Sequence, residues 1–212
     1  MRTEDGPAHQ TELESFVMIP PVQPEVPVEG SPVEAPARAE NKFSALDVET
    51  ILREHGWLLL EVRVAEDPAL QIWFARAAEF LGPHSLDRDA LTELLSLFFC
   101  CDAAARMQQI GSQSVMSREG ARDVIREIAN RLLDGGDIDS ERLNEIVDSV
   151  KKSTPYRSRE IFHPLRLALA GRVGEGELDR VILLIDFASK LNFAAPVKSC
   201  RQRMIEFCAA LD

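Results

Sequence analysis

The chain of 212 residues has few aromatic side chains and no excess of positive charge. Phe, Trp and Tyr make up 6% of it, with a single Tyr, which argues against a carbohydrate platform or a β-sandwich rich in aromatic residues. Its 24 Lys and Arg face 35 Asp and Glu, so the net charge is −11. Such a protein has no global positive field that attracts nucleic acid, and any such binding must use a local patch.

Cysteine and long apolar runs are also scarce. The four cysteines form no Cys-x-x-Cys pair and have no His at zinc-finger spacing, so we expect no metal site and no cofactor. No stretch approaches the roughly 20 apolar residues of a membrane span. The acidic start, followed by prolines, does not resemble a signal peptide. We therefore expect a cytoplasmic protein with free thiols and no membrane partner.

Residues 1–45 differ sharply from the remainder. They contain seven of the 12 prolines, and eight acidic against three basic side chains give a charge of −5. Such a segment buries too little apolar surface to fold, and its prolines favour extended chain. We predict a disordered, acidic, proline-rich tail or tether, with a specific docking peptide as the alternative. Residues 46–212 then carry the remaining −6.

From residue 46 onward, apolar residues recur at helical spacing and no convincing strand is present. Start and stop signals divide this part into nine short helices. The expected helices follow Ser44 as far as Gly56, span 68–81, 89–99 and 103–110, follow the caps Ser117 and Asp139, and span 158–170, 178–187 and 197–210. We predict an all-α domain over 46–212, divisible into subdomains 46–136 and 137–212.

No active site is recognisable in the sequence. The four histidines (His9, His55, His84 and His163) have no evident catalytic partner, and a lone histidine is more often a cap or a surface residue. The motifs of serine hydrolases, zinc proteases, dinucleotide-binding proteins and P-loop proteins are all missing. The glycines between 171 and 176 follow a helix rather than a strand, which is typical of a helix end and turn.

Positive charge gathers in residues 151–172. Six cations (Lys151, Lys152, Arg157, Arg159, Arg166 and Arg172) stand there against Glu160 alone, which gives +5. Tyr156 and Phe162 lie among them, so the segment offers cations for phosphates and rings for unstacked bases. The alternative is a solvated face in which Lys152 complements a helix end and Arg166 pairs with an acid.

The run from Arg159 to Arg172, REIFHPLRLALAGR, resembles a block in the carboxy-terminal anticodon-binding region of bacterial glutamyl-tRNA synthetases. Residues 175–185 and 196–203 resemble the helix after that block and the closing helix, and the similarity extends over residues 46–212. One departure is Ala170, where the family has Thr. The resemblance implies a superhelical cage that binds the anticodon arm of a tRNA, namely the tRNA for glutamate.

Carried over by resemblance, the cations Lys151, Lys152, Arg157, Arg159 and Arg172 would contact backbone phosphates. Arg88 and His84, in an inter-helix turn, are weaker candidates for contacting a base. Phe162, Pro164, Arg166 and Gly171 have structural or supporting roles. We expect no DNA ligand.

The sequences that mark the catalytic half of these synthetases are missing, and Val115-Met116-Ser117-Arg118 resembles its lysine-rich loop only superficially. We therefore expect no enzyme activity. A protein partner bound through the tail could supply catalysis. The alternative function is a helical scaffold that has lost RNA binding and presents its grooves to proteins.

Overall fold

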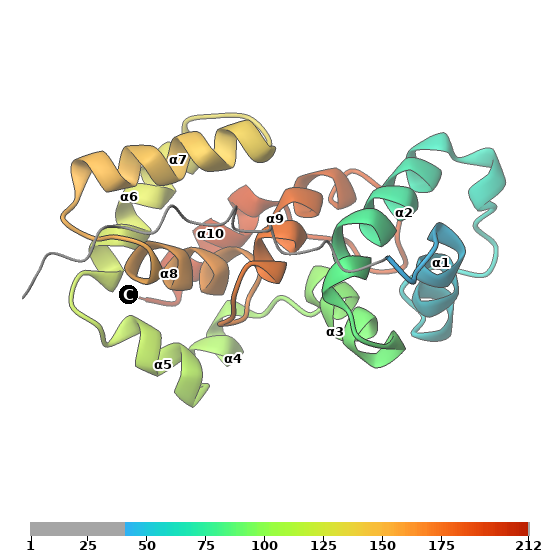
Figure 1. Cartoon of the computed structure of the whole chain (residues 1–212), viewed down its shortest axis with the longest axis horizontal. Coiled ribbons are helices and arrows are strands. Elements are labelled where there is room, and N and C mark those ends of the chain that lie inside the picture. The colour runs from blue at the N-terminus through green and yellow to red at the C-terminus, as the bar shows by residue number, and fades with distance from the viewer. Residues whose placement is uncertain (1–40, 212) are drawn as a thin grey trace, which may run out of the picture. The chain divides into compact units, whose positions relative to one another are not determined.

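The structure is a computed structural model in which residues 41–211 are described. Those residues form ten α-helices and two short 3-10 helices, and none of them lies in a strand, which confirms the all-α prediction (Figure 1). The predicted disorder of the tail falls mostly on residues 1–40, outside the described part. The elements are α1 (Ala45–Glu54), η1 (Val64–Glu66), α2 (Pro68–Leu81), η2 (Gly82–His84), α3 (Arg88–Phe99), α4 (Ala103–Met107), α5 (Ile110–Met116), α6 (Ala121–Leu133), α7 (Ser140–Ser153), α8 (Arg159–Leu169), α9 (Glu177–Ala188) and α10 (Cys200–Ala209).

The helices with strong start signals begin where the sequence predicts. Ser44 and Asp47 form a complete capping box at α1, in which each side chain accepts a hydrogen bond from the other residue's backbone N–H. Asp67 accepts from the first N–H groups of α2, whose first residue, Pro68, has no N–H to satisfy. Asp139 caps α7 in the same way. These local signals suffice because each satisfies donors that a helix start leaves free.

Residues just before α1 contact the end of α2. Asn41 donates a hydrogen bond of 3.0 Å from its Nδ2 to the carbonyl of Ala78 in α2. Its side chain also fills the space next to Gly82, where a Cβ would lie 2.0 Å from Asn41 Oδ1. The fold therefore includes at least residues 41–44, which attach the chain to the end of α2.

The region from 103 to 121 contains the main error in the predicted helices. The expected helix 103–110 ends at Met107, and α5 follows as a separate helix, so the described part has ten helices instead of nine. Ser117 was predicted to start the next helix, but it is the C-cap of α5. The helix α6 begins after Gly120, which has a φ of 79°. A side chain there would also meet the Tyr156 ring, with a Cβ 1.9 Å from Cζ, so the turn favours glycine.

The start of the last helix was also misplaced. It begins at Cys200 rather than near Val197, because Ser199 and Gln202 form a capping box at that point. Asp186, buried in α9, supports this start by accepting a hydrogen bond of 2.7 Å from the Cys200 N–H. Its other oxygen accepts from the Ile138 N–H, also at 2.7 Å. The Asp186 carboxylate therefore connects two backbone positions to α9: Ile138, shortly before α7, and Cys200, the first residue of α10.

The core is continuous along the described helices. The helix α2 packs against α1 and α9, α3 packs against α9, and α6 packs against α7, α8 and α10. Trp73 of α2 is fully buried and donates from its indole N–H to the Leu184 carbonyl of α9 at 3.3 Å. Packing thus crosses residue 136, and the division into two subdomains stays a prediction. Within residues 41–211, no helix has the length and apolar composition needed to cross a bilayer.

Candidate nucleic-acid interface

The basic segment predicted from the sequence comprises the end of α7, a short loop and α8. The loop folds on itself, because Arg157 Nη1 donates to the carbonyls of Thr154 at 2.8 Å and Tyr156 at 2.6 Å. Glu160 accepts from the backbone N–H of Arg157 at 2.9 Å. Ser158, just before α8, has a φ of 43° and is the one non-glycine residue with positive φ in the described part. Arg157 therefore uses part of its donor capacity to hold this loop.

Acidic residues neutralise several of the predicted cations. Lys151 lies 2.9 Å from Asp148, and Arg172 lies 3.1 Å from Glu93. Arg159 and Arg88 pair with Glu175 and Glu54. Lys152 is exposed and makes no ion pair in the part of the chain that the structure describes. The local excess of +5 is therefore partly offset by acids that lie outside residues 151–172.

The candidates divide into two groups. His84, Arg88 and Arg172 lie around α3: the first two precede or begin that helix, and the third contacts its Glu93. The other four (Lys151, Lys152, Arg157 and Arg159) lie at the junction of α7 and α8. In Figure 1, α9 lies between α3 and α7. A ligand that contacts both groups must extend across several helices, as an RNA stem-loop can.

Arg118, which the sequence reasoning did not select, joins the second group. It lies in the turn between α5 and α6, and its Nη1 is 3.2 Å from His163 Nδ1 on α8. Arg118 and Arg159 also line one shallow hollow, together with Pro164 and the neighbouring residues Val115, Glu119, Ala121 and Glu160. No local sequence signal brings Arg118 to α8, because Arg118 and His163 are 45 positions apart in the chain.

His163 has a more specific environment than a lone histidine on a surface. Its side chain is 12% exposed. Since arginine can only donate, Nδ1 must accept from Arg118, and the ring proton of the neutral imidazole lies on Nε2. Nε2 is buried and has no hydrogen-bond partner. Burial lowers the pKa of His163, and Arg118, Arg166 and Arg159 lower it further, while Glu175 opposes them.

Arg166 fixes the loop between α8 and α9. Its guanidinium is buried and forms two hydrogen bonds with the Asp179 carboxylate, at 2.7 and 2.8 Å. It also donates to the Gly174 carbonyl at 2.9 Å, and it lies 5.0 Å from the centre of the Phe162 ring. Burial is the largest influence and by itself would lower the pKa of Arg166, but the hydrogen bonds and charge of Asp179, together with the charges of Glu175 and Glu177, outweigh it and raise the pKa. Arg166 is therefore charged and unavailable to a ligand.

The remaining residues with predicted supporting roles shape α8. Pro164 lies inside the helix, where it removes one backbone donor, and its buried ring lines the hollow beside Arg118. Phe162 is half-buried, packs against the core and has the Arg166 guanidinium over its ring. Gly171 ends the helix with a φ of 74°, and its carbonyl accepts from Arg106 Nη1.

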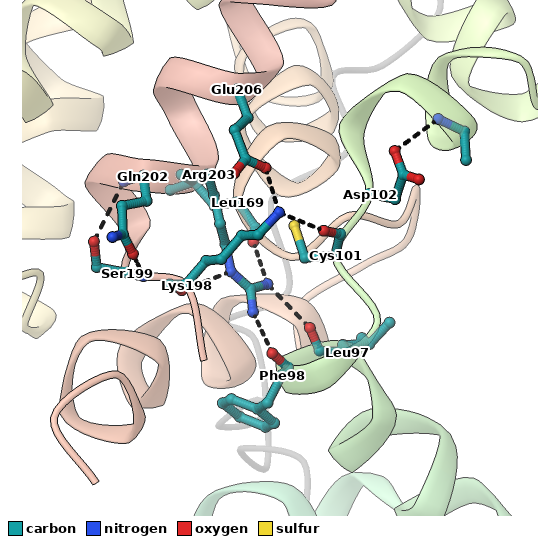
Figure 2. Close-up of polar contacts among 11 residues, drawn as sticks. Leu97, Phe98, Cys101, Asp102, Leu169, Lys198, Ser199, Gln202, Arg203 and Glu206 are labelled. Carbon is teal, nitrogen blue, oxygen red and sulfur yellow. Dashed lines mark hydrogen bonds and ion pairs between the residues drawn. The ribbon is translucent and has the colours of Figure 1, made fainter. Parts of the chain in front are cut away.

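Arg203 of α10 joins the ends of several elements (Figure 2). It is 1% exposed, and its Nη1 donates to the carbonyls of Leu97 at 3.0 Å and Leu169 at 2.9 Å. Its Nη2 donates to the Phe98 carbonyl at 2.8 Å, and its Nε to that of Lys198 at 3.0 Å. These oxygens include the free carbonyls at the ends of α3 and α8, where the helix dipole favours a cation. Arg203 therefore holds α3, which carries one group of candidates, next to α8, which carries the other.

Comparison with known proteins adds one finding. A family model described as an anticodon binding domain matches residues 48–186, which is more than half of the chain. The match begins in α1 and ends in α9, so it includes both groups of candidate residues. No curated protein and no solved structure matches the chain.

Proposed function

Because the chain belongs to the family of anticodon-binding domains, we propose that it is a non-catalytic module that binds the anticodon arm of the tRNA for glutamate. The family match over residues 48–186 is the observation that carries the proposal. The choice of tRNA rests on the resemblance of residues 159–172 to the glutamyl-tRNA synthetase block. That the module acts by binding alone rests on the missing synthetase motifs.

Two kinds of contact would hold the RNA. Exposed cations at the α7–α8 junction, above all Lys152, Arg157 and Arg159, would position backbone phosphates. The turn before α3, with His84 and Arg88, would face splayed bases, whose edges an arginine can contact with two hydrogen bonds. Arg88 must leave Glu54 to do so, since the two side chains form an exposed ion pair. An exposed pair of this kind is worth only about 0–1 kcal/mol, so RNA can displace it.

A gel shift with the purified full chain tests this function. We expect total tRNA to shift at micromolar protein in low salt and duplex DNA of equal length to shift less. Binding should weaken steeply with salt, because each phosphate contact releases counterions. Absence of a tRNA shift at about 10 µM protein in low salt would contradict the proposal, because even non-specific complexes have dissociation constants of about 10⁻⁴–10⁻⁶ M at physiological salt.

The acids that pair with the cations favour a second candidate, the protein-binding scaffold. Glu54, Glu93, Asp148 and Glu175 each lie within 4 Å of a predicted RNA-binding cation. A surface neutralised in this way attracts RNA weakly unless the acids are displaced. A missing tRNA shift, together with an unchanged fold, would leave the scaffold as the better account.

The partner and the compartment follow as further parts of the proposal. We propose that the acidic tail binds a protein partner that supplies catalysis, and deleting residues 1–40 should then abolish co-purification of that partner without changing the melting curve of the folded part. None of the four cysteines forms a disulfide within the described residues. This supports a reducing compartment, for which we propose the cytoplasm.

A further inference from the structure

We propose that Glu175 is an internal competitor of RNA: its carboxylate occupies a phosphate site formed by Arg159 and the Nε2 of His163, and bound RNA replaces it with a backbone phosphate. The inference rests on the proposed function and names a regulatory element within the α7–α8 part of that surface.

The carboxylate of Glu175 lies among cationic groups without a close hydrogen bond to any of them. Its Oε1 is 3.7 Å from Arg159 Nη2 and 4.0 Å from His163 Nε2, and its Oε2 is 3.6 Å from Arg166 Nη1. Direct hydrogen bonds between such groups measure about 2.7–3.2 Å. The Glu175 side chain is 65% exposed. Glu175 is therefore held mainly by charge attraction, at a position that another anion can take.

The loop does not need the Glu175 side chain for its fold. Arg166 already has its main partner in Asp179, at 2.7 and 2.8 Å, and fixes the loop through the Gly174 carbonyl. The backbone N–H of Glu175 donates to the Glu177 side chain, and its carbonyl accepts from the Leu178 N–H. The carboxylate can therefore leave the cluster while the loop keeps its backbone contacts.

The groups around the carboxylate suit a phosphate better than a carboxylate. Arg159 is 77% exposed, and its contact with Glu175, at 3.7 Å, is longer than a hydrogen bond. The Nε2 of His163, which carries the ring proton, is a buried donor without a partner and faces the Glu175 side. A phosphate offers more acceptor oxygens than a carboxylate and can pair with a guanidinium through two hydrogen bonds. It can therefore satisfy both Arg159 and the orphaned Nε2.

Fluorescence anisotropy with labelled tRNA compares the full-length parent with Glu175→Gln. We expect Glu175→Gln to bind roughly fivefold more tightly with an unchanged melting temperature, since it removes a competing anion held by weak exposed pairs. Glu79→Gln is the matched control, because Glu79 is exposed on α2 and makes no ion pair in the described part. If tRNA binds the parent and both variants equally, the competitor role is wrong while the proposed function stands.

Inorganic phosphate provides a readout that does not depend on tRNA. In NMR spectra of the full chain, phosphate should shift the His163 ring signals at a several-fold lower concentration in Glu175→Gln than in the parent, and Arg159→Ala should remove the effect. Such shifts without any tRNA binding would support the phosphate site and contradict the proposed function. Ring signals that phosphate leaves unchanged in both proteins would overturn the site.

Discussion

Replacing Arg203 by Met is expected to destabilise the fold by about 4 kcal/mol. Met retains much of the apolar volume but removes hydrogen bonds to the carbonyls of Leu97, Phe98, Leu169 and Lys198. A buried acceptor left without a partner costs about 1–3 kcal/mol. The costs do not add fully, since water can reach the more exposed oxygens, and some of the loss is offset because burial disfavours the charged guanidinium and lowers the pKa of Arg203.

Urea denaturation followed by circular dichroism measures this loss. The control is Arg201→Met, because Arg201 is exposed on the same helix and makes no hydrogen bond or ion pair in the described residues. It should change the free energy of unfolding by no more than about 0.5 kcal/mol. Arg203→Lys should fall between the parent and Arg203→Met, because an ammonium can serve only some of the carbonyls. A loss below 1 kcal/mol for Arg203→Met would refute the reasoning.

Three further changes separate binding from folding. Changing Arg157 and Arg159 together to Ala should weaken tRNA binding about tenfold in anisotropy and reduce its salt slope by up to about two, while circular dichroism stays unchanged; parent-like affinity would assign both to a solvated face. Leu165→Ala should lower the free energy of unfolding by about 2–5 kcal/mol in urea, since Leu165 is fully buried, and a negligible loss would contradict that burial. His163→Gln should flatten the pH dependence of the melting temperature. Because the pKa of His163 is lowered in the fold, the unfolded chain takes up its proton first as the pH falls through about 6.5, and stability declines there; parallel curves for parent and variant would exclude His163 as the titrating group.

The helices that the sequence predicts well are those with a strong local start signal. The capping box at Ser44 and the proline at position 68 place α1 and α2 at their observed first residues. The same reasoning fails between residues 103 and 121, since α5 has no apolar stripe and Ser117 resembles a cap on either side. The boundary between α5 and α6 is set by Gly120, whose positive φ and closeness to the Tyr156 ring depend on the tertiary structure.

The candidate site was predictable in its charges but not in their partners. The cations of residues 151–172 are visible as a cluster in the sequence, and so is the family block. The anions that pair with them come from elsewhere: Glu93 reaches Arg172 across 79 positions. Arg118 reaches His163 across 45 positions, from a turn that no pattern connects to α8. Which cations remain available to RNA is therefore a property of the packing.

Competition binding with RNA fragments tests the central claim most directly. A labelled tRNA for glutamate is bound to the full chain and displaced either by its isolated anticodon stem-loop or by its acceptor minihelix, at equal ionic strength. Recognition of the anticodon arm predicts that the stem-loop competes at a concentration at least tenfold lower than the minihelix, and that changing its anticodon bases weakens the competition. Equal competition by both fragments, without any effect of the anticodon bases, would contradict the account.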